Sequence, residues 1–180
     1  KLGLFVETVT LTRRGSGVHL SGRLAPAQVP GALIEVVLDT GAPEPGSATG
    51  PFSLYVGTQS LPMSSLAEIP PLFGFEGIDG AMDFRIWARV ADGELLRMHG
   101  DAEISRLRVR GEDLEVADRI IQPRYSTESI ALDFQWNREG EAWRLGVPRL
   151  EVTRRGRVQR GELTLVHLPD EQAGTDQLSL

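Results

Sequence analysis

Apolar and polar side chains alternate along most of this chain. The clearest run is Ala81–Val90, where Phe84, Ile86 and the residues in step with them share one side, while the residues between are mostly charged. The same two-residue period recurs in eight other stretches, which are 18–24, 34–39, 52–56, 96–105, 130–136, 143–147, 150–153 and 163–167. A period of two is typical of β-strands with one apolar face. The pattern therefore predicts an all-β fold.

Short polar turns separate these strands. Asp92-Gly93 is a strong hairpin signal between 81–90 and 96–105, and Asn137–Glu141 lies between the next pair of strands. Strands joined by short turns predict an antiparallel meander. Its apolar face needs a cover, and three solutions stay open at this point. The sheet folds on itself, pairs with a second sheet, or remains open and binds something apolar.

Three stretches break the alternation. Thr40–Pro51 consists almost entirely of Gly, Pro and small residues, and predicts an exposed loop. Around 62–70 we expect one short helix, because Ser64–Ile69 suits one or two helical turns and Pro70-Pro71 would stop it. The glycine-rich segment Gly74–Gly80 predicts a turn that leads into the strand at Ala81.

One short sequence motif, called here the Thr-Arg-Arg-Gly phrase, occurs twice in the chain. Val9–Gly15 and Leu150–Gly156 both end in Thr-Arg-Arg-Gly, and both lead into another strand. We interpret 1–169 as slightly more than one repeat unit of a longer array, and 170–180 as a linker or the start of the next unit. The alternative is coincidence, because a hairpin corner of this kind is a short string. Cutting an array exposes unpaired strand edges, so we also expect edge-to-edge self-association.

Composition narrows the possible partners and chemistry. The net charge is −6 and the pI is about 5.1, which argues against a nucleic-acid partner. The chain has no cysteine, which excludes disulfides, thiolate chemistry and cysteine zinc sites.

Residues that could carry catalysis are sparse. The histidines, His19, His99 and His167, fall on polar strand faces or strand ends and lack the spacing of metal ligands. Carboxylates cluster at turns in Glu112-Asp113 and in Asp92 with Glu94, where acidic residues are common. We therefore expect a protein that is not an enzyme and has no metal or cofactor. A small β-rich hydrolase that uses turn carboxylates remains a distant alternative.

The three tryptophans suggest two different roles. Trp136 and Trp143 flank one hairpin turn, and we expect them to touch across the strands. Trp87 falls on the polar face of its strand, either as a platform for a sugar or lying over neighbouring Arg stems. A β-sandwich binding module for carbohydrate or protein is therefore the second functional hypothesis.

Several short strings resemble the AsmA-like proteins of Gram-negative envelopes, and within them the YhdP type. They are Leu54–Val56 followed by Ser60–Ala67, Gly80–Trp87 with its hairpin through 92–95, and Leu132–Trp136 with Trp143–Leu145 followed by Leu150–Gly156. The likeness covers most of the chain from about residue 50 onward. Ala142 stands where the family usually has glycine, which is a mild departure.

The resemblance implies a non-enzymatic segment of a long periplasmic protein anchored in the inner membrane. Such proteins look like stacked β-units curled into an open groove or taco-like sheet that carries phospholipid toward the outer membrane. Phospholipid acyl chains and neighbouring repeats of the same chain would then be the partners. The alternative for the candidate lining residues is that they fill a closed core. These candidates are Val18, Leu20, Ile34, Val36, Leu38, Phe52, Leu54, Met82, Phe84, Ile86, Met98, Ile104, Ile130, Leu132, Phe134, Trp143, Leu145, Leu163 and Leu165.

Overall fold

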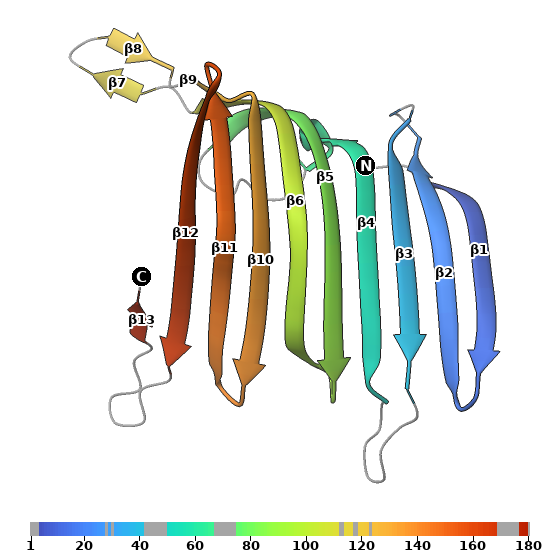
Figure 1. Cartoon of the computed structure of the whole chain (residues 1–180). Coiled ribbons are helices and arrows are strands. Elements are labelled where there is room, and N and C mark those ends of the chain that lie inside the picture. Colours follow the sequence, from blue (N-terminus) through green and yellow to red (C-terminus); the bar gives the residue numbers. More distant parts are fainter. Residues whose placement is uncertain are drawn as a thin grey trace.

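The protein is a broad sheet of antiparallel strands (Figure 1). The computed structural model describes residues 4–27, 29, 31–41, 50–66, 75–111, 114–116, 119–122, 124–168 and 177–179. The strands of the first half are β1 (Leu4–Arg14), β2 (Gly17–Pro26), β3 (Leu33–Thr40), β4 (Phe52–Pro62), β5 (Phe75–Ala91) and β6 (Glu94–Gly111). Those of the second half are β7 (Leu114–Val116), β8 (Arg119–Ile121), β9 (Arg124–Ser126), β10 (Ser129–Glu139), β11 (Ala142–Arg154), β12 (Arg157–Leu168) and β13 (Gln177–Ser179).

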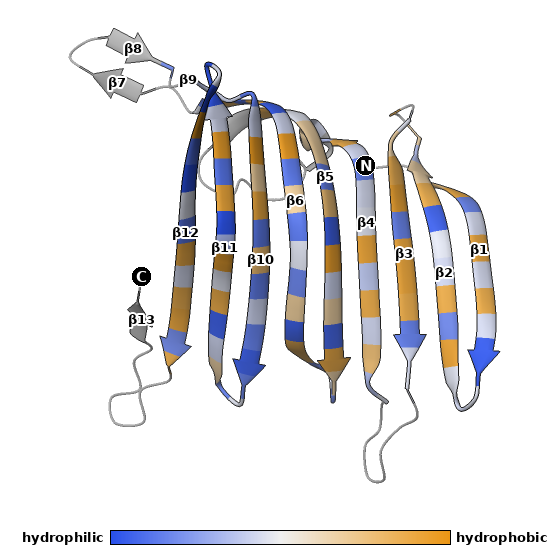
Figure 2. Ribbon diagram, in the orientation of Figure 1, coloured by the Kyte–Doolittle hydropathy of each residue, from blue (hydrophilic) through white to orange (hydrophobic). Residues whose placement is uncertain are grey.

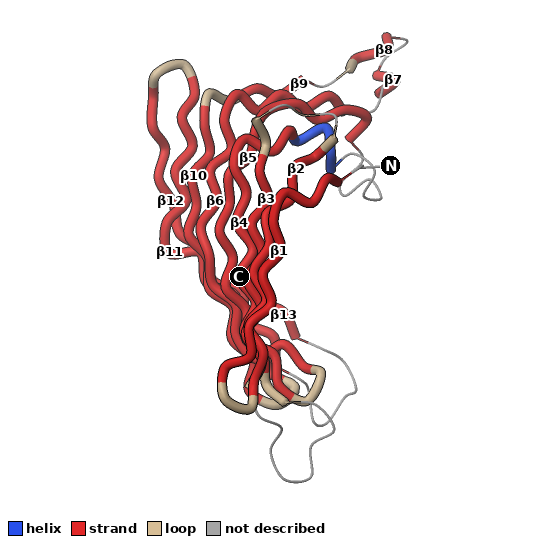
Figure 3. Tube along the Cα trace, turned by 90° about the vertical axis from the view of Figure 1, so that its right-hand side faces the viewer, coloured by secondary structure: helices blue, strands red, loops and turns tan. Residues whose placement is uncertain are grey.

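The strand order confirms the predicted open meander. Neighbours follow the order β1-β2-β3-β4-β5-β6-β10-β11-β12-β13, β9 pairs with the far end of β6, and every pairing is antiparallel. β7 and β8 form a separate two-stranded ribbon. β1 and β13 do not pair with each other, so the sheet is not closed, and Figure 3 shows it edge-on as one twisted layer.

The expected short helix is present in part. Met63–Leu66 form a 3-10 helix, η1, directly after β4, and residues 67–70 of the prediction lie outside the described residues. η1 contacts β5 and the end of β4. It therefore covers only one end of the sheet.

The small closed core lies beneath η1. Met63, Leu107 and Val109 are 7%, 8% and 8% exposed and pack together. Partly buried neighbours from β5, β6 and β10 surround them, namely Ile78, Met82, Ile104 and Ile130. No large side chain in the described part of the chain is fully buried. Stability must therefore come mainly from strand pairing and from packing between side chains on the same face.

The predicted turn at Gly74–Gly80 is wrong for the residues that are described. β5 already begins at Phe75 and continues through Gly80, where the pairing with β6 shifts register. Gly80 has φ +135°, and a Cβ placed there would lie 2.9 Å from the Ser105 carbonyl oxygen. The glycine thus permits a bulge inside a long strand, which is a second common use of glycine in sheets. Gly74 lies outside the described residues.

The two Thr-Arg-Arg-Gly phrases occupy different places in the sheet. The β1–β2 turn is Gly15-Ser16, with φ +61° at Gly15, whereas the β11–β12 turn is Arg155-Gly156, with φ +52° and +69°. β1 and β11 run in opposite directions, and their turns lie at opposite ends of the sheet in Figure 1. Copies repeated along one sheet would run the same way. This arrangement does not support the repeat interpretation, and the unit boundaries remain a prediction.

Two other predicted segments are described only in part. At the Thr40–Pro51 loop, β3 reaches Thr40, and the Gly41 amide donates to the Pro51 carbonyl at 2.7 Å, while residues 42–49 lie outside the described residues. In the tail predicted as a linker, Gln177–Ser179 form β13 against the end of β12. Residues 170–176 and 180 are not described.

Candidate functional site

One face of the sheet is apolar from β1 to β12. The pairing register aligns side chains into rows that cross the strands, and the bands of hydropathy along each strand in Figure 2 follow the same two-residue period. The most complete row, called here the central row, runs across nine strands without a polar residue. It consists of Leu11, Leu20, Leu38, Leu54, Ala88, Met98, Trp136, Leu145 and Leu165.

All nineteen residues predicted to line a groove lie on this face. The same registers place Phe84 and Ile86 in rows beside the central row, and Leu132 and Phe134 continue those rows on β10. The placement follows from strand pairing alone. It does not by itself test whether lipid binds there.

No layer covers the apolar face within the described residues. Each strand contacts its sheet neighbours, and η1 is the only other element that packs on this face. The nine strands cover eight spacings of about 4.8 Å, and about eight residues of each strand at about 3.3 Å give roughly 26 Å along the strands. The face therefore outlines roughly 1,000 Å². The largest apolar patch of a typical soluble monomer is about 300–600 Å². The face is therefore much larger than incidental surface hydrophobicity explains.

At the centre of the apolar face, a phenylalanine ring fills the gap that a glycine leaves. Gly100 lies between Ile86 and Phe134 in one row, where the absence of a side chain would leave a gap. A Cβ built on Gly100 would lie 2.9 Å from Cζ of Phe134 and would also meet the Arg85 carbonyl oxygen. The phenylalanine ring thus lies over the glycine and fills the gap, an arrangement known from other sheets.

The β1 edge is the most exposed part of the face. Every residue of β1 is exposed, with Val9 at 58% and Leu11 at 70%. β1 pairs only with β2, so its outer backbone groups have no strand partner among the described residues. Unpaired edges with apolar side chains are templates for further strand pairing.

We predict that the chain associates through this edge as its concentration rises. Lysines at Thr10 and Thr12, on the polar face of β1, should shift the association to higher concentration by charge repulsion between edges. Analytical ultracentrifugation over a concentration series measures the effect. A wild-type chain that stays strictly monomeric at high concentration would contradict the prediction. Equal association of the lysine variant would assign the contact to the apolar face instead.

The opposite face, called here the polar face, carries ion pairs that span neighbouring strands. Arg85 bonds Asp101 at 3.1 Å, and Arg149 bonds Asp133 at 2.9 Å; the four side chains form one row across β5, β6, β10 and β11. The hydrogen bond and charge of Asp101 raise the pKa of the Arg85 guanidinium. Exposed pairs of this kind add little stability, because water screens their charges.

Two histidines lie on the polar face and the third lies next to a strand end, as predicted. His19 and His99 lie on the polar face, and His19 bonds Asp39 at 2.6 Å. His167 instead lies on the apolar face, with its ring 5.4 Å from that of Trp143 and nearly parallel to it. No group of three or more His, Asp or Glu suited to a metal ion occurs among the described residues.

The tryptophan pair is diagonal in the sheet, so its expected contact stays a prediction, and only one of the two carboxylate clusters is described. Register places Leu145 opposite Trp136, and Arg138 opposite Trp143, so the two indoles are not direct cross-strand partners. Glu94 forms an ion pair with Arg138 at 3.4 Å. Glu112 and Asp113, the other predicted carboxylate cluster, lie outside the described residues.

Sequence reasoning missed one feature of the polar face. Trp87 lies on this face, as predicted, and its ring neighbours are Tyr55 and His99. These rings border a depression of about 600 Å³. The three residues lie opposite one another on adjacent strands. This alignment can be recognised only once the pairing register is known.

None of the helical structure in the described residues is long and apolar enough to cross a membrane. Comparison of the chain with protein families, curated proteins and solved structures finds no match.

Proposed function

We propose that this chain is a non-enzymatic segment of a periplasmic, inner-membrane-anchored protein that conducts phospholipid toward the outer membrane. The acyl chains lie along the apolar face. The observation that carries the proposal is the central row, which crosses nine strands without a polar residue or a covering layer among the described residues. The compartment and the direction of transport come from the sequence resemblance to AsmA-like proteins.

The energetics favour an open surface for this task. Exposing an acyl chain to water costs about 0.8 kcal/mol per methylene, or roughly 20 kcal/mol or more for the two chains of a phospholipid. A long apolar face lowers that cost at every position along a path. It requires no catalytic group and no tight pocket. Acyl chains offer no hydrogen bonds, which matches rows built almost entirely from aliphatic and aromatic side chains.

A sandwich module is less well supported. It would require a second sheet over the apolar face, and the only other sheet among the described residues is the two-stranded β7–β8 ribbon. A docked protein would typically require polar groups among the apolar ones at its contact surface. The centre of the apolar face has few: Thr58 and Thr40 are its polar members on β3 and β4.

The direct test is lipid extraction from the purified chain followed by mass spectrometry. We expect phospholipid to co-purify and to exchange with labelled phospholipid supplied in vesicles. A delipidated chain that is folded by circular dichroism and takes up no phospholipid would overturn the proposal. A stoichiometric protein bound to the apolar face in place of lipid would overturn it as well.

A further inference from the structure

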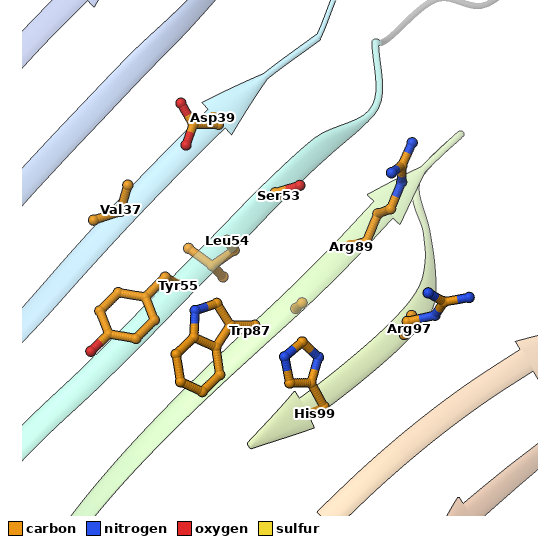
Figure 4. Close-up of a pocket in the computed structure, with 10 residues that line it drawn as sticks. Val37, Asp39, Ser53, Leu54, Tyr55, Trp87, Arg89, Arg97 and His99 are labelled. Carbon is orange, nitrogen blue, oxygen red and sulfur yellow. The ribbon is translucent and has the colours of Figure 1, made fainter. Parts of the chain in front are cut away.

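A row of aromatic rings crosses three strands on the polar face. Tyr55, Trp87 and His99 are paired in register on β4, β5 and β6. The ring centroids of Tyr55 and Trp87 are 5.1 Å apart, and those of Trp87 and His99 are 5.2 Å apart with an interplanar angle of 9°. Figure 4 shows the three rings side by side with their faces turned toward the viewer. They form one aromatic row, in which the Tyr55 ring is tilted by 42° from that of Trp87.

A glycine lets the first ring of this row lie along the sheet. Gly57 is two residues beyond Tyr55 on the same side of β4. A Cβ built on Gly57 would lie 3.0 Å from Cζ of Tyr55 and would also meet its hydroxyl oxygen. The phenol ring therefore lies over the glycine, and the absence of a side chain there determines its orientation.

Two arginines next to the rings face each other without a counter-charge. Arg89 and Arg97 are direct cross-strand partners, one position along from Trp87 and His99 on the polar face. Neither guanidinium makes an ion pair or hydrogen bond with another residue in the described part of the chain. Like charges placed directly opposite destabilise a sheet, and arginine stays charged at any physiological pH. An anion bound between them would remove that repulsion.

The other side of the depression is lined by side chains that accept hydrogen bonds. They are Asp39 on β3 and Ser53 on β4. The two arginines lie at the opposite end of the same cross-strand row (Figure 4). Asp39 also accepts from His19 at 2.6 Å, which fixes its carboxylate. The volume of about 600 Å³ lies within the range of small-molecule sites, about 300–1,000 Å³.

We propose that this depression binds an acidic sugar, a pyranose ring that carries a carboxylate or a phosphate. The C–H groups of a pyranose are weakly positive and meet the negative faces of the aromatic rings. Asp39 and Ser53 bond the sugar hydroxyls, and Arg89 and Arg97 hold the acidic group through charge-assisted hydrogen bonds. The site is on the face opposite the proposed lipid surface. A negative result for lipid transport would therefore not affect this proposal.

The test is a titration of the 15N-labelled chain with glucuronate, glucose 6-phosphate and glucose, followed through the indole N–H of Trp87 by NMR. We expect saturable binding, with at least one acidic sugar bound about tenfold or more tightly than glucose. Arg97→Gln, which leaves Arg89 in place, should reduce that preference for the acidic sugars. Trp87→Ala, which removes the indole and is therefore followed through the backbone amides of Tyr55 and His99, should abolish binding of all three sugars. Gly57→Val should weaken binding by displacing Tyr55. Trp143→Phe, on the apolar face, is the matched control and should bind like the wild type.

Other outcomes would overturn the proposal. Glucose that binds as tightly as both acidic sugars would exclude a role for the arginines. Inorganic phosphate that binds as tightly as glucose 6-phosphate would show that the rings contribute nothing. Adenosine monophosphate that binds more tightly than every sugar would assign the site to nucleotides, and the absence of any saturable shift at Trp87 would exclude a site.

Discussion

Replacing Leu132 by arginine is expected to reduce phospholipid retention by roughly 100-fold. Leu132 lies at the centre of β10 on the apolar face, between Ala102 and Leu150. A cationic side chain among acyl chains costs about 2.5–3.5 kcal/mol at the centre of a bilayer, and 1.4 kcal/mol corresponds to a factor of ten in affinity. Quantitative extraction of phospholipid per chain measures the effect.

The adjacent residue provides a matched control. Ala131 is on the polar face, directly between Glu103 and Glu151, so an arginine there gains two acidic neighbours. Ala131→Arg should retain lipid at the wild-type level, and both variants should keep the circular dichroism of a β-protein. Equal lipid retention by the two variants would contradict the assignment of the apolar face. Unfolding of Leu132→Arg alone would indicate that this position is core.

Truncating Leu107 to alanine should lower the free energy of unfolding by about 2–3 kcal/mol. Leu107 is 8% exposed and packs with Met63 and Val109 beneath η1. Removing a packed leucine side chain loses its transfer free energy and leaves a cavity, and this site is the best-filled part of the chain. Urea unfolding followed by circular dichroism gives the difference.

An exposed leucine in the same sheet serves as its reference. Leu11 is 70% exposed on β1, so Leu11→Ala should change the free energy of unfolding by about 0.5 kcal/mol or less. Together the two changes in the free energy of unfolding would distinguish a packed position beneath η1 from an exposed position on the apolar face. Similar losses at both sites would mean that a partner or a second copy covers β1 in solution.

The sequence pattern anticipated the sheet but not its irregularities. The two-residue period of Ala81–Val90 predicted which side of β5 is apolar, because a regular strand alternates its side chains between faces. Bulges interrupt that rule and leave little trace in composition. Leu96, expected on the same face of β6 as Met98, has no partner on β5 because the register shifts there, and it is 37% exposed.

The limits of prediction at the two faces have the same cause. Membership of the apolar face required only local alternation, so all nineteen predicted residues lie on it. The aromatic row on the polar face depends on three strands meeting at one level, which is set by turn lengths and bulges along the whole chain. Tyr55 and His99 stand 44 positions apart, and no local pattern connects them with Trp87.

The strand order also bears on how the molecule folds. Apart from the step from β6 to β10, each strand of the sheet from β1 to β12 pairs with the strand that follows it in the chain. The contact order is therefore low for a β-protein, and little loop-closure entropy opposes each new pairing. A growing chain can add one hairpin at a time during synthesis, and each newly completed strand becomes the template for the next.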